Sequence, residues 1–149
     1  MRGRIGSVPD VLADGYTLVP EAPPAAAAVL LRERSGLSPK TLRQSELAMA
    51  GSWAAAHVVH GASGAIVGQG RVIGDGGWYF HIADMAVLPE HQRQGIGDAV
   101  LAHLVERIRA AAPGDAYITL LADPPGRRLY AKHGFVETAP HSLGMVLRD

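Results

Sequence analysis

The feature that most constrains the fold is a change of sequence period at Trp53. From there, three runs rich in Val, Ile and aromatic residues follow one another, at residues 53–60, 65–73 and 78–87. They are separated by the Gly-rich segments 61–64 and 74–77, which are strong signals of hairpin turns. The sequence therefore predicts three antiparallel strands in the middle of the chain.

A glycine-rich turn follows the third run. Residues 92–97 read Gln-Arg-Gln-Gly-Ile-Gly and open a helix that extends to about residue 112. At a helix N-terminus, unpaired backbone N–H groups and the helix dipole together favour an anion such as a pyrophosphate. The turn by itself also fits a simple strand-to-helix connection. A dinucleotide-binding fold does not fit, because its glycines would open an early βαβ unit rather than follow three antiparallel strands.

The remaining elements complete the expected order. We predict a first strand at 16–19, helices at 22–34 and 38–50, a strand at 117–121, a helix from Pro124 to Gly134, and closing strands at 135–137 and 143–147. This order predicts an α+β (mixed α/β) fold with a central mixed, mostly antiparallel β-sheet of six to seven strands and about four flanking helices. We expect one domain over residues 1–149, with residues 1–14 as a mobile segment.

The composition limits the classes of molecule that the protein is expected to bind. The 14 basic and 14 acidic residues give a net charge of zero and form no long basic block, which argues against nucleic-acid binding. The chain has no cysteine, so disulfides, thiolate metal sites and a cysteine nucleophile are excluded, and we expect no metal. No apolar run resembles a signal peptide or reaches the ~20 residues that span a bilayer, so we expect a cytoplasmic protein without membrane contact.

Two motifs together resemble the GNAT superfamily of acetyl-CoA-dependent N-acetyltransferases. Residues 84–97 fit its strand followed by Gln/Arg-x-x-Gly-x-Gly/Ala, and residues 129–135 fit its Leu-Tyr-x-x-x-Gly-Phe. The resemblance covers roughly residues 16–147. It implies the GNAT fold and acetyl-CoA (coenzyme A) as co-substrate.

The resemblance also implies where the co-substrate binds. In the family the fourth strand is bulged and splays from the fifth, so the backbone of Met85, Ala86 and Val87 would bind the pantetheine arm. The pyrophosphate would be held by the turn and the first helical residues, namely Gln92, Arg93, Gln94, Gly95, Ile96, Gly97 and Asp98. Asp123 stands where the family often has an asparagine, and an acid cannot donate a hydrogen bond as an amide does. Arg128 either reaches a cofactor phosphate or lies on a solvated face.

Acetyl transfer to an amine needs a base for the amine and a proton for the departing thiolate. By resemblance, Tyr130 lies near the cofactor sulfur as general acid; packing of its ring into the core is the alternative. An unperturbed histidine has a pKa of about 6.5, so His81 is the first candidate base, unless it only lines the sheet or a water chain takes the proton. Asp84 is the second candidate base, with a structural hydrogen-bonding role as its alternative.

The predicted activity is transfer of acetyl from acetyl-CoA to a primary amine of a small molecule or peptide, by direct attack in a ternary complex. Trp53, Trp78 and Tyr79 are candidates for the acceptor pocket, and core packing is their alternative role. A non-catalytic acyl-CoA-binding sensor and a transferase for longer acyl groups remain open. Homodimers are common in the superfamily. The sequence leaves the identity of the acceptor open.

Overall fold

The computed structural model describes residues 12–149. Most of the segment expected to be mobile, residues 1–11, therefore lies outside the described residues. By its backbone contacts the chain divides into two compact units, one ending at Thr119 and one running from Leu120 to Asp149. Each unit is considered by itself below, and a single domain over the whole chain stays a prediction.

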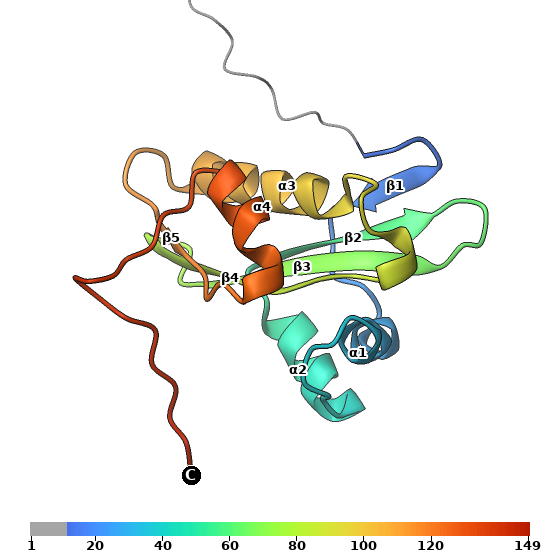
Figure 1. The fold of residues 1–149 in the computed structure, drawn as a ribbon, viewed down its shortest axis with the longest axis horizontal. Coiled ribbons are helices and arrows are strands. Elements are labelled where there is room, and N and C mark those ends of the chain that lie inside the picture. The colour runs from blue at the N-terminus through green and yellow to red at the C-terminus, as the bar shows by residue number, and fades with distance from the viewer. Residues whose placement is uncertain (1–11) are drawn as a thin grey trace, which may run out of the picture. The chain divides into compact units, whose positions relative to one another are not determined.

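The first unit is built on one β-sheet (Figure 1). Its five strands lie in the order β1-β2-β3-β4-β5, antiparallel except that β5 runs parallel to β4. The two Gly-rich segments form the expected turns, with Gly64 and Gly76 in the left-handed region at φ 71° and 76°. The bounds are β1 (Tyr16–Val19), β2 (Ala54–His60), β3 (Ile66–Gly74), β4 (Tyr79–Val87) and β5 (Tyr117–Thr119).

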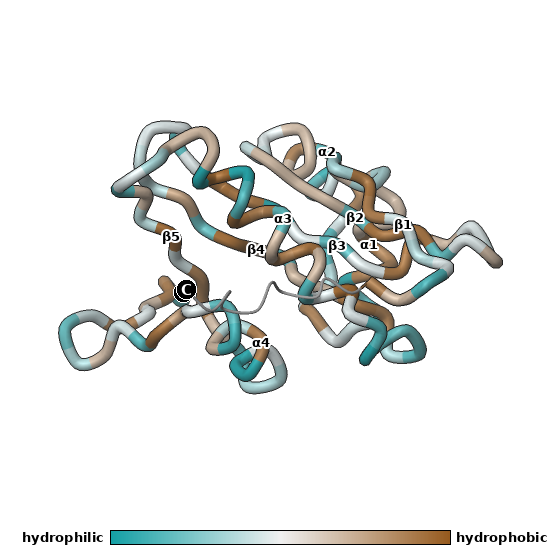
Figure 2. The backbone as a smooth tube through the Cα atoms, turned by 90° about the horizontal axis from the view of Figure 1, so that it is seen from above, coloured by the Kyte–Doolittle hydropathy of each residue, from teal (hydrophilic) through white to brown (hydrophobic). Residues whose placement is uncertain are grey.

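Helices cover both faces of this sheet. Helices α1 (Ala25–Arg34) and α2 (Leu42–Gly51) lie on one face, and α3 (Ile96–Ala111) lies on the other (Figure 1). Hydrophobic and hydrophilic stretches alternate along α3 (Figure 2). Its sheet-facing stripe is fully buried, as the 3.6-residue period predicts, and comprises Ile96, Val100, Leu101, Leu104 and Ile108.

Two helices begin later than the sequence suggested, and both shifts have local causes. Pro24 has extended backbone angles at the N-cap of α1, so the helix begins at Ala25 rather than at residue 22. Thr41 and Gln44 form a capping box, in which each side chain accepts a hydrogen bond from the other's backbone N–H. This places the start of α2 at Leu42 rather than at residue 38.

Two glycines on β3 let α3 approach the sheet closely. A Cβ placed on Gly68 would collide with the side chain of Ile96 at the start of α3. A Cβ placed on Gly70 would lie 2.5 Å from Sδ of Met85 and 2.7 Å from Cγ1 of Val100. The absence of side chains at these positions therefore fixes how α3 and β4 pack against β3.

The C-terminal unit contains a 3₁₀ turn (Pro124–Gly126) and the short helix α4 (Arg127–Lys132). The predicted strands at 135–137 and 143–147 are wrong, because neither pairs with any strand in the described chain. An alternation of apolar and polar residues forms a strand only where it can pair with a sheet edge. Val136, Met145 and Leu147 remain 86%, 91% and 93% exposed. Residues 12–149 thus form five strands, fewer than the six to seven expected.

Candidate active site

A β-bulge interrupts β4 at its centre. Gln69 of β3 pairs with Ala86 and Arg71 pairs with Ala83, so Asp84 and Met85 together face the single residue Gly70. Asp84 takes up the distortion with φ 56°, a left-handed conformation that is unusual for a residue with a side chain. Bulges of this kind bend a strand and re-aim its side chains.

Beyond this bulge β4 has no strand beside it on one edge. The pairing with β5 extends only from Tyr79 to His81, which lie opposite Tyr117 to Thr119. Within the described residues, the edge of β4 at residues 82–87 therefore has no strand partner on that side. Met85, Ala86 and Val87 lie in this stretch, where backbone groups are available to an extended ligand that carries amides.

The glycine-rich turn leads from this open edge into α3. Pro89–His91 form a 3₁₀ turn, Arg93 has φ 64°, and Gly95 caps α3 with φ 76°. In the part of the chain that the structure describes, the backbone N–H groups of residues 93–97 donate to no protein acceptor. Asp98 lies in the first turn of α3, and Gln92 Nε2 makes a long 3.5 Å contact with the Val87 carbonyl. The turn thus presents several free donors at the positive end of a 16-residue helix.

Strand β1 supports this turn from the side. The Tyr16 hydroxyl lies 2.7 Å from Nδ1 of His91, and the two rings meet edge to face with centroids 5.7 Å apart. The backbone N–H of Ala13 donates to the Gln94 carbonyl at 2.9 Å. The turn is therefore held through carbonyl and side-chain groups, which leaves the N–H groups of residues 93–97 unused.

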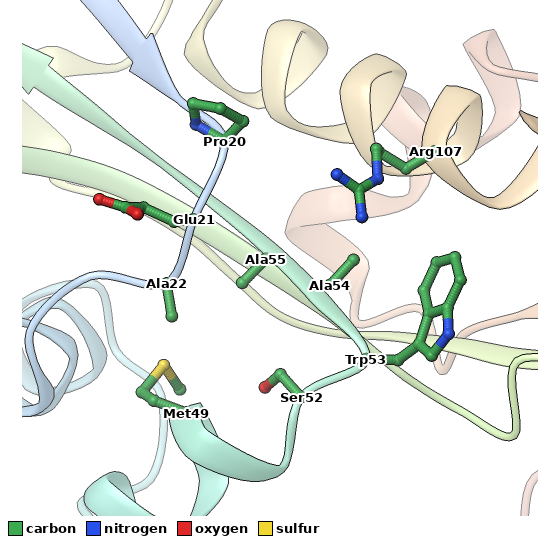
Figure 3. A pocket seen from close by; sticks show the side chains of 9 residues that line it. All are labelled: Pro20, Glu21, Ala22, Met49, Ser52, Trp53, Ala54, Ala55 and Arg107. Atoms are coloured by element: carbon green, nitrogen blue, oxygen red, sulfur yellow. The ribbon is translucent and has the colours of Figure 1, made fainter. Parts of the chain in front are cut away.

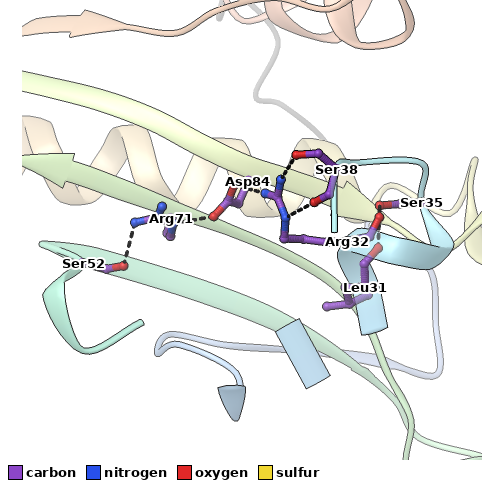
Figure 4. Close-up of polar contacts among 7 residues, drawn as sticks. All are labelled: Leu31, Arg32, Ser35, Ser38, Ser52, Arg71 and Asp84. Atoms are coloured by element: carbon purple, nitrogen blue, oxygen red, sulfur yellow. Dashed lines mark hydrogen bonds and ion pairs between the residues drawn. The ribbon is translucent and has the colours of Figure 1, made fainter. Parts of the chain in front are cut away.

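Asp84 is locked between two arginines (Figure 4). One carboxylate oxygen accepts from Nη1 of Arg32 on α1, and the other accepts from Nε of Arg71 on β3, both at 2.5 Å. All three side chains are mostly buried, with exposed fractions of 13–16%. The pair of ion bridges holds the bulged residue and ties α1 to the sheet.

His81 lies on the same face of the sheet as Arg71. The register places His81 opposite Ile73 on β3 and Thr119 on β5, and its Nδ1 lies 3.0 Å from Oγ1 of Thr119. Burial lowers the pKa of His81 below the ordinary histidine value, and the Arg71 guanidinium lowers it further. The imidazole is thus held neutral at pH values where a free histidine begins to be protonated.

The helices leave the sheet uncovered around His81. Ile73, Tyr79 and Tyr117 are 46%, 41% and 45% exposed, and the two tyrosine rings meet edge to face with centroids 5.3 Å apart. We call this surface the His81 face and define it by Arg71, Ile73, Tyr79, His81, Tyr117 and Thr119. Trp78 is also exposed and packs on Tyr79, with ring centroids 5.3 Å apart.

Trp53 has different ring contacts from Trp78 and Tyr79, the other two candidates for the acceptor pocket. Its ring packs edge to face on the buried Phe80, with centroids 4.8 Å apart. It also lines a separate pocket of about 230 Å³ at the start of β2, together with Glu21 and Arg107 (Figure 3). Tyr79 thus lies on the His81 face and contacts Trp78, whereas Trp53 contacts Phe80 and lines a different pocket.

Arg71, Arg32 and Thr119 did not stand out in the sequence, although each contacts a candidate residue. A signal existed for Arg71, which is a charged residue inside an otherwise apolar strand run. Arg32 joins Asp84 across 52 residues of sequence, and no local pattern reveals that contact.

The C-terminal unit contains the other candidate residues. Tyr130 lies on α4, packs on Phe135 with ring centroids 6.2 Å apart, and rests so close to Gly126 that a Cβ there would lie 2.7 Å from its Cε2. Burial raises the pKa of the Tyr130 phenol, and the Asp123 carboxylate raises it further. Arg128 is exposed on the same helix.

Sequence and structure comparisons identify the family of this chain. The chain belongs to the GNAT acetyltransferase family, because residues 52–137 match its acetyltransferase (GNAT) domain. This also confirms the mixed α+β fold class that the sequence predicted. Among the described residues, no helix is both long and apolar enough to cross a membrane.

Three relatives illustrate the similarity. A probable acetyltransferase of unknown function from meticillin-resistant Staphylococcus aureus is 33% identical with a TM-score of 0.83, covering 90% of this chain and 99% of that one. A GNAT family acetyltransferase from Streptococcus pneumoniae shares the fold at 22% identity and a TM-score of 0.71, covering 90% of this chain and 98% of that one. The uncharacterized N-acetyltransferase ycf52 of Pyropia yezoensis is 32% identical over 84 residues, which are 56% of this chain and 47% of that protein. The chain thus spans about half the length of the curated relatives it matches.

Proposed function

We propose that this protein transfers the acetyl group of acetyl-CoA to a primary amine by direct attack in a ternary complex. The observation that carries the proposal is the bulged β4, whose open edge leads into unpaired amides at the N-terminus of α3. Coenzyme A combines an extended arm bearing amides with a pyrophosphate, and these two parts match the two features in the same order along the chain.

The residues present fit this co-substrate. Met85, Ala86 and Val87 would bind the arm through their backbone, and the amides from Arg93 onward would bind the pyrophosphate. Left-handed residues that are not glycine cluster at functional sites, and both such residues in the described chain, Asp84 and Arg93, lie here. The bound thioester supplies an activated acetyl group. Roles for Asp123 and Arg128 in binding it stay predictions.

His81 is the proposed base. The Thr119 hydroxyl lies 3.4 Å from the Phe80 carbonyl, to which it donates, so Oγ1 accepts from Nδ1–H of His81. This tautomer leaves Nε2 as an acceptor for a proton from the amine, directly or through water. The lowered pKa of His81 keeps that acceptor unprotonated near neutral pH.

We assign Asp84 a positioning role instead. Both of its carboxylate oxygens already accept from guanidinium groups, so proton abstraction would compete with two ion pairs. Tyr130 is the proposed acid, because its raised pKa keeps the phenol protonated and able to donate to a departing thiolate.

The test is thiol release from acetyl-CoA across a panel of amines that includes amino acids, arylalkylamines, polyamines, aminoglycosides and peptide N-termini. We expect release that depends on an amine. Binding of coenzyme A without release from any amine would contradict the proposal and favour a non-catalytic sensor. Comparison of acetyl-CoA with longer acyl-CoA donors tests the acyl length in the same assay, and sedimentation tests whether the protein is a dimer.

A further inference from the structure

We propose that the acceptor amine carries an anionic group, a carboxylate foremost, and that Arg71 binds this group beside His81. The inference rests on the proposed function and adds the class of acceptor. It is carried by the Arg32–Asp84–Arg71 cluster (Figure 4) and by the uncovered His81 face next to it.

The cluster contains more positive than negative charge. Two guanidinium groups share the single carboxylate of Asp84, so one positive charge is left unbalanced in a mostly buried setting. Such a charge is costly to bury unless an anion joins it, and guanidinium groups bind carboxylates and phosphates with good geometry. An anionic acceptor would supply the missing partner.

Arg71, unlike Arg32, has a hydrogen-bond donor that remains available to a ligand. Arg32 uses Nη1 for Asp84, Nε for the Ser38 carbonyl at 2.9 Å and Nη2 for the Ser38 hydroxyl at 3.0 Å. Arg71 uses Nε for Asp84, while Nη1 makes only a long 3.5 Å contact with Ser52. Within the described residues, Nη2 of Arg71 donates to no protein group.

The register places Arg71 close to the proposed base. Arg71 pairs with Ala83 and Ile73 pairs with His81, so Arg71 and His81 are diagonal neighbours on one face of an antiparallel pair. The backbones of diagonal neighbours lie about 7–8 Å apart. The Arg71 guanidinium is also near enough to the imidazole to lower the pKa of His81, so one small acceptor would reach both side chains.

Apart from Thr119, the rest of the His81 face is apolar or aromatic. Ile73, Tyr79 and Tyr117 are exposed around His81 and would contact the side chain of such an acceptor. The combination of a cationic residue, a neutral base and an aromatic surface fits an amino acid with an apolar or aromatic side chain. It does not fit a polyamine, whose cationic groups Arg71 would repel.

The test compares matched acceptors that differ in one anionic group. The first pair is phenylalanine and phenylalaninamide, and the second is phosphoethanolamine and ethanolamine, which separates carboxylate from phosphate recognition. For each pair we would measure kcat/KM for thiol release with the wild-type protein, Arg71→Gln and Arg32→Gln. Because each ratio is compared between proteins, the differing reactivities of the amines cancel.

Arg32→Gln is the matched control, since it removes a guanidinium from the same carboxylate but leaves Arg71 in place. We expect the wild-type protein to prefer the anionic member of the phenylalanine pair. Arg71→Gln should reduce that preference at least tenfold through KM. Arg32→Gln also removes the surplus charge but keeps the free donor of Arg71, so it should reduce the preference clearly less. Thermal denaturation of both variants reports any common loss of folding.

The possible outcomes distinguish the inferred acceptor class from the proposed acetyltransferase function. If amines are acetylated but neither anionic amine is preferred, or if Arg71→Gln keeps the wild-type ratio, the inference is overturned while the proposed function stands. If Arg32→Gln changes the ratio as much as Arg71→Gln, the effect comes from the cluster as a whole, and the assignment to Arg71 is overturned. If no amine gives thiol release, both the inference and the proposed function fail.

Discussion

The two units of the chain differ in how their side chains are held. In residues 12–119, buried apolar side chains from Ala28 to Ala112 form the core between the sheet and its helices. In residues 120–149 no side chain is fully buried, and the best-packed candidate residue is Tyr130, between Gly126 and Phe135. Changes in the first unit should therefore alter stability first, and changes around Tyr130 should alter turnover first.

The sharpest test of this contrast is Tyr130→Phe, which removes one hydroxyl from the C-terminal unit. General acid catalysis contributes about 10² to 10⁴ in rate, so we expect kcat to fall by about that factor. Steady-state kinetics should show this fall, while calorimetry should show unchanged coenzyme A affinity and thermal denaturation an unchanged Tm. An unchanged kcat would remove Tyr130 from the mechanism.

Asp84→Asn is the corresponding change in the first unit. Asparagine tolerates the left-handed backbone of the bulge, so the substitution isolates the loss of charge. Breaking a mostly buried ion pair typically costs about 3 kcal/mol, and we expect a loss of this size in urea denaturation. Glu90→Gln is the matched control, because its ion pair with Arg34 is exposed and should cost less than about 1 kcal/mol. Equal losses in the two variants would contradict the structural role of Asp84.

One glycine in each unit allows the effect of the same substitution, glycine to alanine, to be compared between the units. Gly70→Ala would push into Met85 and Val100 and should cost about 1–3 kcal/mol of stability. Gly126→Ala would push into the Tyr130 ring and should lower kcat about tenfold, equivalent to about 1.4 kcal/mol, with little change in Tm. Denaturation and kinetics on both variants check this, and the reverse pattern would break the contrast between the units.

The smallest expected effect is a shift in pH dependence. The lowered pKa of His81 should place the acidic limb of kcat/KM below the ordinary histidine value. Burial is the larger cause and stays in place in Arg71→Gln, but loss of the cation removes the second cause, so the pKa rises and the limb moves to higher pH. A pH profile with an anion-free acceptor measures this. A limb that stays in place, or moves to lower pH, would contradict the assignment of His81 as base.

Much of the first unit was predictable because its elements carry local signals. The turns at 61–64 and 74–77, the apolar stripe of α3 and the glycine turn at 92–97 each follow from residues close together in sequence. The open edge of β4 and the bulge at Asp84 were expected only through family resemblance. Strand periodicity alone would not reveal either, because both depend on where β3 and β5 pair.

The features that the sequence did not predict correctly have one physical cause: each depends on residues that are distant in the sequence. Residues 143–147 alternate as a strand does, yet no strand in the described chain receives them, so the pattern stays unpaired. The surplus positive charge near His81 was missed because Arg32 and Arg71 lie far apart in sequence and meet only through Asp84. The sequence contains no basic cluster, whereas the fold creates one.

The most direct test of the central claim is the stoichiometry of transfer with isotopically labelled acetyl-CoA. The protein would be incubated with the labelled donor and the best amine of the panel, and thiol and product measured together by absorbance and mass spectrometry. We expect one labelled N-acetyl product for each thiol released, with no label retained on the protein. Thiol release without acetylated amine, or a labelled protein that forms before any product, would contradict direct transfer.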